Sequence, residues 1–428
     1  MKFETMINTE EKYTLVINYP TLSAGGIEVY LAALMRYCLS EGHRVIWITT
    51  TRCLQEIAFT GIADDPRLEI VISERWNRYF GVADIRFQES ERVVMISCRA
   101  MSYIVAEEIK RRARVRSFQH FFTVAHFAGS AYYPDRYLKH KWARSIVFHF
   151  WKKIVSRLVE KDCLRAFSLK HLECYEDYYG VPIPDKLDKV LPVFAVEHKE
   201  FDFQNTEERA GERGQRFIIT TCSRFMFPHK GYVLGLVQAF GIMKEKYPYA
   251  ELWIIGHGEG ETQLQEKIGT LPQDVQSGIR MIGLVSPDEL QDCYKRSHLI
   301  VGLAGAIWDG AMSGIPSLVV RHYCCECETY GYFEDAFEKT LSEEPGESIV
   351  PYIEACITMR QDEYVGHAQK GYAAACAYKE SEENPNYFFE QRNAASAITV
   401  YRPWEPILGR ILYVMFMIRD RFFRHAEA

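Results

Sequence analysis

The sequence lacks three features that mark large classes of proteins. It has no basic excess, because 51 Lys and Arg stand against 57 Asp and Glu and give a formal net charge of −6. That balance argues against a dedicated nucleic-acid binder. It has no long hydrophobic run, since the longest, 411–418, is far shorter than the ~20 residues that a spanning helix requires. The first 20 residues are charged, so no secretory signal is expected. These absences predict a cytoplasmic protein that touches a membrane at most at its surface.

Cysteine is plentiful but has no regular spacing. Twelve cysteines are scattered along the chain, which favours free thiols in a reducing compartment over a disulfide framework. The densest group is "CCECE", which holds Cys324, Cys325 and Cys327. A C-C-x-C spacing does not fit a zinc site, and no second Cys or His pair follows at a suitable distance. We therefore expect ordinary loop residues and no metal.

The sequence does contain a repeated unit of strand, glycine turn and helix. Residues 13–20 are apolar and β-branched, a glycine turn and a helically spaced segment follow, and 44–50 reads as the next strand. The same alternation returns between 216 and 320, where we expect Ser286 to cap a helix. The polar stretch 198–215 is predicted to be a linker. A chain of 428 residues can form two domains, so the pattern predicts two doubly wound α/β domains.

Four short motifs occur in an order that is typical of one enzyme family. They are a Gly-Gly turn, an Arg followed by Lys-Gly, a Gly-x-Gly turn and an acid-led segment that ends in Gly-x-Pro. In this chain they fall at Gly25-Gly26, at Arg224 with Lys230-Gly231, at Gly256 and Gly258, and at 309–316. With these motifs the chain resembles the retaining glycosyltransferases of the GT-B type, in which two Rossmann-like domains face a cleft, and the family 4 group in particular.

The resemblance implies a domain division and a reaction. Residues 1–200 would form the acceptor-side domain, 201–395 the nucleotide-sugar-binding domain, and 396–428 a C-terminal helix that crosses back to the first domain. The implied reaction moves a hexose, with retention, from a nucleotide diphosphate sugar to a hydroxyl of a glycan or lipid-linked acceptor. Neither a metal nor a separate cofactor is implied, because the nucleotide sugar is itself the donor substrate.

Arg224 and Lys230 have the chemistry that a diphosphate requires. Arg offers a forked set of donors and Lys a compact charge, and the helix that opens near Gly231 adds its N-terminal dipole. Both cations would stabilise the departing diphosphate and so take part in catalysis. The alternative is that they are solvated surface cations beside a turn.

The paired glycines suit a close approach of the backbone to a ligand. Gly25 and Gly26 place no Cβ in the way and open a helix whose N-terminus favours anions. An ordinary tight turn is the alternative. Gly256 and Gly258 correspond to the Gly-x-Gly turn of the resembled family and are expected on the nucleotide side.

Asp309 is the only acid between the small-residue loop and Pro316. The resemblance implies that its carboxylate accepts hydrogen bonds from the ribose hydroxyls, and the alternative is that Asp309 merely caps a helix. The family carries a further Glu eight positions earlier, near the transferred sugar, where this chain has Val301. The donor-side carboxylate therefore has no counterpart in this sequence.

Two histidines follow a predicted short strand of the first half. His120 in "FQHFF" resembles the family's sugar-contacting histidine better than His126 in "VAHFA". Imidazole suits both hydrogen bonding and charge stabilisation. A structural role among the neighbouring aromatic residues stays open.

Residues 140–161 combine an apolar stripe with a basic face. That profile is typical of a helix in a membrane interface, and packing of the stripe on the domain core is the alternative. Two rival functions also remain: a non-catalytic GT-B-like protein that binds a nucleotide sugar or a partner, and a sugar-nucleotide isomerase.

Overall fold

The computed structural model describes residues 13–22, 26–73, 85–98, 100–124, 141–192, 200–342, 344–382, 387–390 and 415. The chain divides into two compact units. Unit 1 holds the first strand, Ile27–Pro192 and the short helix α16 (Tyr387–Glu390), and unit 2 holds Gly26 and the described residues from 200 to 382.

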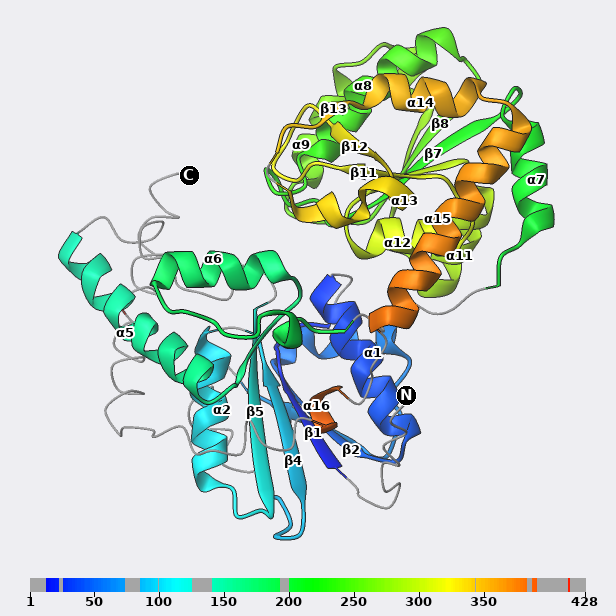
Figure 1. Cartoon of the computed structure of the whole chain (residues 1–428). Helices are drawn as coiled ribbons and strands as arrows, with labels where there is room; N and C mark the ends of the chain where they lie inside the picture. The colour runs from blue at the N-terminus through cyan, green and yellow to red at the C-terminus, as the bar shows by residue number, and fades with distance from the viewer. Residues whose placement is uncertain are drawn as a thin grey trace. The chain divides into compact units, whose positions relative to one another are not determined.

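Unit 1 is built on a parallel sheet in the strand order β3-β2-β1-β4-β5-β6 (Figure 1). This is the strand order of a Rossmann fold. The inner strands β1 and β4 are buried almost end to end, as expected for a parallel sheet that is covered on both faces. The strands are β1 (Tyr13–Asn18), β2 (Arg44–Thr49), β3 (Leu68–Ile72), β4 (Arg92–Ser97), β5 (Ser117–Val124) and β6 (Leu164–Ala166). Among the described residues before Pro192, the helices are α1 (Gly26–Ser40), α2 (Ala100–Arg112), α5 (Lys141–Glu160) and α6 (Leu169–Tyr179), with short 3-10 segments η1 (Thr51–Thr60) and η3 (Leu187–Lys189).

The chain returns to unit 1 after it has completed unit 2. In α16, Phe388 is fully buried and its ring lies 5.2 Å from that of Phe121, centroid to centroid. Phe389 packs on Tyr13 with ring centroids 4.9 Å apart. The helix predicted at 396–428 lies, apart from residue 415, outside the described residues.

Unit 2 repeats the same topology and extends it at one edge. Its sheet has the order β13-β12-β11-β10-β7-β8-β9, in which β12 and β13 run antiparallel. The strands are β7 (Phe217–Cys222), β8 (Ala250–Ile255), β9 (Ile279–Gly283), β10 (Leu299–Gly302), β11 (Ser317–Val320), β12 (Glu328–Tyr332) and β13 (Glu347–Ser348). The five parallel strands again have the Rossmann arrangement, with the first strand of the unit in the middle.

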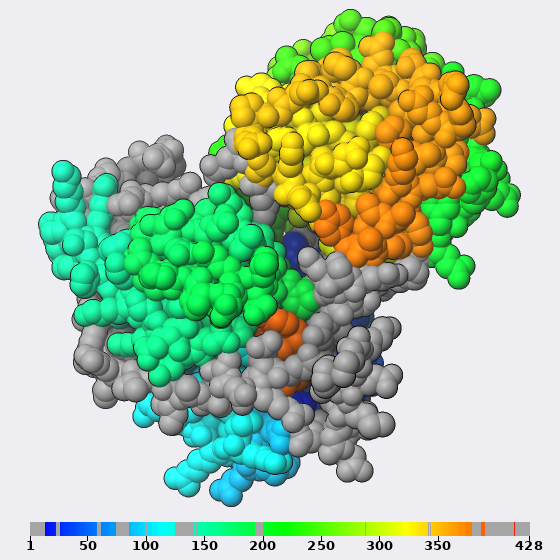
Figure 2. All heavy atoms as spheres, viewed as in Figure 1, coloured from blue at the N-terminus to red at the C-terminus, as the bar shows by residue number. Residues whose placement is uncertain are grey.

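Helices cover both faces of the second sheet (Figure 1). One face carries α8 (Tyr232–Lys246), α9 (Glu261–Gly269) and α14 (Ile349–Thr358), and the other carries α11 (Pro287–Arg296), α12 (Gly305–Met312) and α15 (Gln361–Glu382). The long α15 runs along the surface of the unit, as the orange spheres in Figure 2 show. The remaining short helices are α7 (Phe203–Glu212), α10 (Gln273–Gln276), α13 (Phe333–Ala336) and η4 (Phe337–Leu341).

Local signals in the sequence predicted several of these elements correctly and one wrongly. Ser286 caps α11 in a full capping box with Glu289, as predicted. The predicted linker 198–215 is wrong, because most of it is the helix α7, capped by Asp202. The reason is that α7 is polar on most of its surface and buries only Thr206, Arg209 and Ala210.

Helix α5 divides into two parts. Its second half is buried in unit 1 through Phe150, Trp151, Ile154, Val155 and Leu158. For this half, the apolar stripe packs on the domain core, which was the alternative to membrane contact. Near its start, Trp142 is 63% exposed and Ile146 is 49% exposed. No helix in the described part of the chain is both long enough and apolar enough to cross a membrane.

Candidate functional site

The predicted nucleotide-binding residues of the second half gather around one point of the unit 2 sheet. In a doubly wound sheet, ligands bind outside the carboxyl ends of the strands where the strand order reverses. In unit 2 that point lies between β7 and β10, which pair directly. Arg224 and Lys230 follow β7, and Asp309 follows β10. The topology therefore places all three beside the switch point.

Lys230 is a half-buried cation in the turn before α8. Burial lowers the pKa of its ammonium group to about 8. No described residue forms an ion pair or a side-chain hydrogen bond with it. A charge that is taken out of water without a partner is unfavourable. An anionic ligand would supply the missing partner.

A cysteine-containing loop covers the turn that carries Lys230. The backbone N–H of Tyr323 donates to the carbonyl of His229 over 3.0 Å. On the other side of Lys230, a Cβ on Gly231 would lie 2.6 Å from the sulfur of Cys325, and one on Gly235 would collide with the backbone of the same loop. The glycines at the N-cap and in the first turn of α8 thus admit this loop.

This arrangement explains the "CCECE" segment in a way that the sequence did not predict. Its sulfur atoms belong to free cysteines, and Cys324 and Cys327 are buried. Among the described residues there is no group of three or more His, Cys, Asp or Glu side chains that could hold a metal ion. The sequence signal that could have revealed the packing is the pair of glycines, Gly231 and Gly235, one helical turn apart.

Asp309 lies in the middle of α12 and not at its start. The helix begins at Gly305, after Ala304 as the N-cap residue. The cap alternative for Asp309 is therefore wrong. The small residues Gly305 and Ala306 read as loop in the sequence, but the structure includes them in the first turn.

Lys230 and Asp309 both act on the pKa of Cys222. Cys222 ends β7, and burial raises the pKa of its thiol to about 12. The charge of Asp309 raises that pKa further and the charge of Lys230 opposes the rise. Asp309 also acts on Tyr294 of α11, whose pKa burial raises well above its ordinary value. The two charged groups are thus near enough to the same thiol to influence it.

The loop between β10 and α12 is only two residues long. Val301 lies inside β10 and is fully buried, so an acid at this position would be enclosed in the sheet. Ala304 has a positive φ of 50°, which is unusual for a residue with a Cβ. Ala304 and Gly305 are both exposed, which leaves the first turn of α12 accessible. No acid of this loop replaces the family's further Glu, as the sequence predicted.

Gly256 and Gly258 have a steric role that the structure makes explicit. Both have positive φ values, +132° and +159°. A Cβ on Gly256 would collide with the carbonyl oxygen of Ser223, and one on Gly258 with that of Phe225. The N–H of Phe225 in turn donates to the carbonyl of His257 over 2.9 Å. The two glycines therefore allow the loop after β8 to pack closely against the backbone on both sides of Arg224. Their contact with the nucleotide stays a prediction.

The predicted residues of the first half have different surroundings. Gly25 and His126 lie outside the described residues. Gly26 is the exposed first residue of α1, and nothing lies within 4 Å of an added Cβ. The fold itself therefore does not require a glycine at position 26.

His120 is enclosed in unit 1. It lies in the middle of β5 and its side chain is 1% exposed. Its Nε2 is 2.7 Å from the hydroxyl of Ser97, and its Nδ1 is 2.7 Å from the carboxylate of Glu107. Burial lowers the pKa of His120, while Glu107 acts to raise it. Since both nitrogens have partners inside the unit, the geometry favours the structural role for His120.

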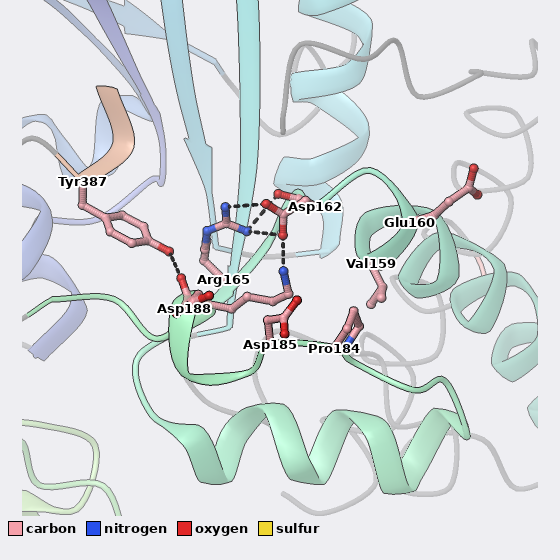
Figure 3. A pocket seen from close by; sticks show the side chains of 9 residues that line it. Val159, Glu160, Asp162, Arg165, Pro184, Asp185, Asp188 and Tyr387 are labelled. Atoms are coloured by element: carbon pink, nitrogen blue, oxygen red, sulfur yellow. Dashed lines mark hydrogen bonds and ion pairs between the residues drawn. The ribbon is translucent and has the colours of Figure 1, made fainter. Parts of the chain in front are cut away.

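Unit 1 has a pocket of about 590 Å³ lined mainly by charged side chains (Figure 3). Arg165, which is 1% exposed, pairs with Asp162 at 3.1 Å, and Lys189 binds the same carboxylate. These cations lower the pKa of Asp162 against the opposing effect of burial. The hydroxyl of Tyr387 donates to the carbonyl of Asp188 over 2.7 Å. The charges compensate one another here, and the pocket wall includes the returning helix α16.

Comparisons of the fold identify similar solved structures. HepE from Anabaena, solved with UDP and glucose, matches with a TM-score of 0.58 and 12% identity over 89% of this chain and 98% of that one. A mutant of S. aureus TarM, solved with fondaparinux, alpha-GlcNAc-glycerol and UDP, matches with a TM-score of 0.56 and 9% identity over 90% and 100%. A Listeria monocytogenes protein assigned as a UDP-N-acetylglucosamine 2-epimerase matches with a TM-score of 0.50 and 13% identity over 88% and 98%.

These structures cover nearly the full length of both chains, so they show that the fold is GT-B. The predicted fold class is confirmed. Neither a family model nor a curated protein sequence matches this chain.

Proposed function

We propose that this chain is a glycosyltransferase that moves a hexose, with retention and without a metal, from a uridine diphosphate sugar to a hydroxyl acceptor. The observation that carries the proposal is the unpartnered ammonium of Lys230 among the described residues at the switch point of unit 2. A nucleotide diphosphate is a suitable anion for that position. The choice of uridine follows from HepE and TarM, which were both solved with UDP.

Each proposed residue has a distinct task in this reaction. Lys230, protonated at neutral pH, attracts the diphosphate and stabilises the negative charge that develops on it as the sugar departs. Arg224, in the loop held by Gly256 and Gly258, adds forked donors to the phosphate oxygens. Asp309 accepts hydrogen bonds from the ribose hydroxyls. His120 is left out of the mechanism because its nitrogens are already engaged.

The acceptor is proposed to be a hydroxyl of a glycan or of a lipid-linked glycan. TarM was solved with alpha-GlcNAc-glycerol, in which a sugar is attached to a small polyol. The basic start of α5 supports a lipid-linked acceptor, because Trp142 and Ile146 are exposed beside Lys141. We propose that these first turns of α5, and not its buried second half, touch an anionic membrane surface.

The central experiment measures release of UDP from a panel of UDP-sugars with and without acceptor glycans. Lys230→Met should lower kcat/KM for UDP release roughly 10²–10³-fold and weaken UDP binding. Lys295→Met is the matched control, because Lys295 belongs to the same unit but is 68% exposed in a pair with Asp292. UDP binding without turnover by the wild type would favour a non-catalytic binding protein.

The same assay tests the isomerase alternative, which the likeness to the Listeria protein supports. An isomerase would convert the donor sugar without any acceptor, and its products would be visible by NMR. Membrane contact is tested separately by flotation with anionic liposomes at low salt. Trp142→Ala together with Ile146→Ala should leave the protein at the bottom of the gradient, and a wild type that stays there would exclude the contact.

A further inference from the structure

The C-terminal end of α12 is held by a buried arginine from a neighbouring helix. The guanidinium Nη2 of Arg209, in α7, donates to the carbonyl of Gly314 over 2.6 Å and to the hydroxyl of Thr206 over 3.0 Å. Arg209 is only 3% exposed. Its Nε and Nη1 are buried and have no hydrogen-bond partner in the described part of the chain. The cation is therefore committed to one helix end.

The end of α12 is built as a defined turn to which the arginine binds. The N–H of Gly314 donates to the carbonyl of Ala311 and that of Ile315 to the carbonyl of Gly310, the pattern of a Schellman motif. Gly314 has the left-handed φ of 64° that this motif requires. A positive charge at a helix C-terminus is favourable because it opposes the helix dipole. Arg209 thus stabilises the turn both by a hydrogen bond and by its charge.

The position of α12 is also fixed by its contact with strands β10 and β11 of the sheet. A Cβ on Gly310 would lie 2.7 Å from a side-chain carbon of Ile300 in β10 and 2.8 Å from the hydroxyl of Ser317 in β11. The helix therefore rests almost directly on the sheet. The Gly310 contact and the hydrogen bond from Arg209 to Gly314, which together with Thr206 we call the Arg209 clamp, leave the helix little freedom to slide or tilt. Asp309 precedes both contacts in α12 and follows its first turn, where Gly305 is exposed.

We infer that Arg209 is a positioning residue for nucleotide binding. It fixes α12 so that the Asp309 carboxylate can reach the ribose hydroxyls. This inference rests on the proposed function. Thr206 belongs to the same clamp, because its hydroxyl accepts from Arg209 and also lies 3.4 Å from the carbonyl of Gly314. The clamp comes from α7, the segment that the sequence suggested was only a linker.

The same helix supplies a matched control. Arg213 in the turn after α7 is 4% exposed and also donates to carbonyls at a helix end, Cys356 over 2.6 Å and Met359 over 2.8 Å. Those carbonyls belong to the end of α14 and not of α12. Arg213→Met should therefore lower the stability of unit 2 as Arg209→Met does, but should leave Asp309 in place.

The experiment measures the Kd for UDP by calorimetry, the KM and kcat for the donor, and thermal stability in each variant. Arg209→Met should raise the Kd and KM roughly threefold to thirtyfold with little change in kcat. Arg209→Lys should recover part of the affinity because it restores the charge. Arg213→Met should change the Kd by less than about twofold. Thr206→Val, a milder change, should give a smaller rise in Kd and serves if Arg209→Met does not fold.

A double variant separates positioning from simple stabilisation. If Arg209 acts through Asp309, Arg209→Met should add almost nothing to the Kd of an Asp309→Asn protein, since the two effects are not additive. Equal Kd changes in the Arg209 and Arg213 variants, or full additivity with Asp309→Asn, would overturn the inference. A wild type that binds no UDP would instead overturn the proposed function.

Discussion

Unit 1 and unit 2 have the same parallel topology, but the cations inside them differ in whether they form ion pairs. In unit 1, Arg165 and Lys189 share the carboxylate of Asp162, so the charges are compensated within the fold. In unit 2, Lys230 is half-buried and has no ionic partner among the described residues. A cation that is paired with a carboxylate can contribute to the stability of the fold. A buried cation without such a partner lowers that stability, and binding of an anionic ligand would explain its presence.

The histidine and arginine contacts extend the comparison. His120 in unit 1 is satisfied at both nitrogens, whereas Arg209 in unit 2 has two buried donors with no partner in the described residues. The His120 contacts thus stabilise the core of unit 1, while Arg209 binds the C-terminal end of α12 in unit 2.

The largest effect is expected from the aromatic anchor of unit 1. Phe388→Ala removes a fully buried ring that packs on Phe121, which should cost about 3–5 kcal/mol of stability. Hydrogen exchange should show faster opening of β5 and unchanged protection of β7. Leu187→Ala is the control, because Leu187 is 74% exposed. A weaker Kd for UDP in Phe388→Ala would mean that the two units are not independent in this respect.

Removal of Arg165, which is paired, and of Lys230, which is not, should change the stability of the protein in opposite directions. Arg165→Met leaves Asp162 without its buried partner and should cost about 2–3 kcal/mol, less than for a fully buried pair because the carboxylate is partly exposed. Lys230→Met removes an uncompensated charge, so it should leave stability equal or higher while kcat/KM falls roughly 10²–10³-fold. Thermal unfolding and UDP release measure the two sides. A Lys230→Met protein that is clearly less stable would break the comparison.

The sequence could predict what depends on local patterns. Apolar periodicity and glycine turns identified the alternation of strands and helices, and Ser286 identified a helix start. It could not predict α7, because a helix that buries few side chains reads like a polar linker. The partners of His120 also escaped prediction. Glu107 and Ser97 are 13 and 23 residues away and are brought close only by sheet pairing.

The same reasoning applies to the candidate site. Arg224, Lys230 and Asp309 were found from motif order, and the topology places them at one switch point. The packing beside Lys230 was not predictable, since a loop about 95 residues later lies against Gly231 and Gly235. Local sequence can identify a cation but not its solvation, because solvation is decided by what folds over it.

A smaller effect is expected from His120, and it decides between the two roles of this residue. His120→Gln should cost about 1–3 kcal/mol because it leaves the buried carboxylate of Glu107 with a weaker partner. The kcat should stay within about threefold of the wild type, as for a residue that does not touch the reacting atoms. Denaturation curves and steady-state rates measure both. A 100-fold loss of kcat in a stable protein would restore the catalytic role.

The last prediction is a dependence on pH that separates binding from stability in unit 2. Burial lowers the pKa of Lys230 to about 8 from an ordinary value of 10.5. The unbound protein therefore loses the charge above pH 8, and kcat/KM should fall about tenfold per pH unit there. The unfolded chain keeps the proton up to about pH 10.5, so stability should rise with pH between about 8 and 10.5. Lys230→Arg keeps its charge throughout and should remove the fall in kcat/KM. If that fall persists in Lys230→Arg, another group titrates and Lys230 is not the cation that meets the diphosphate.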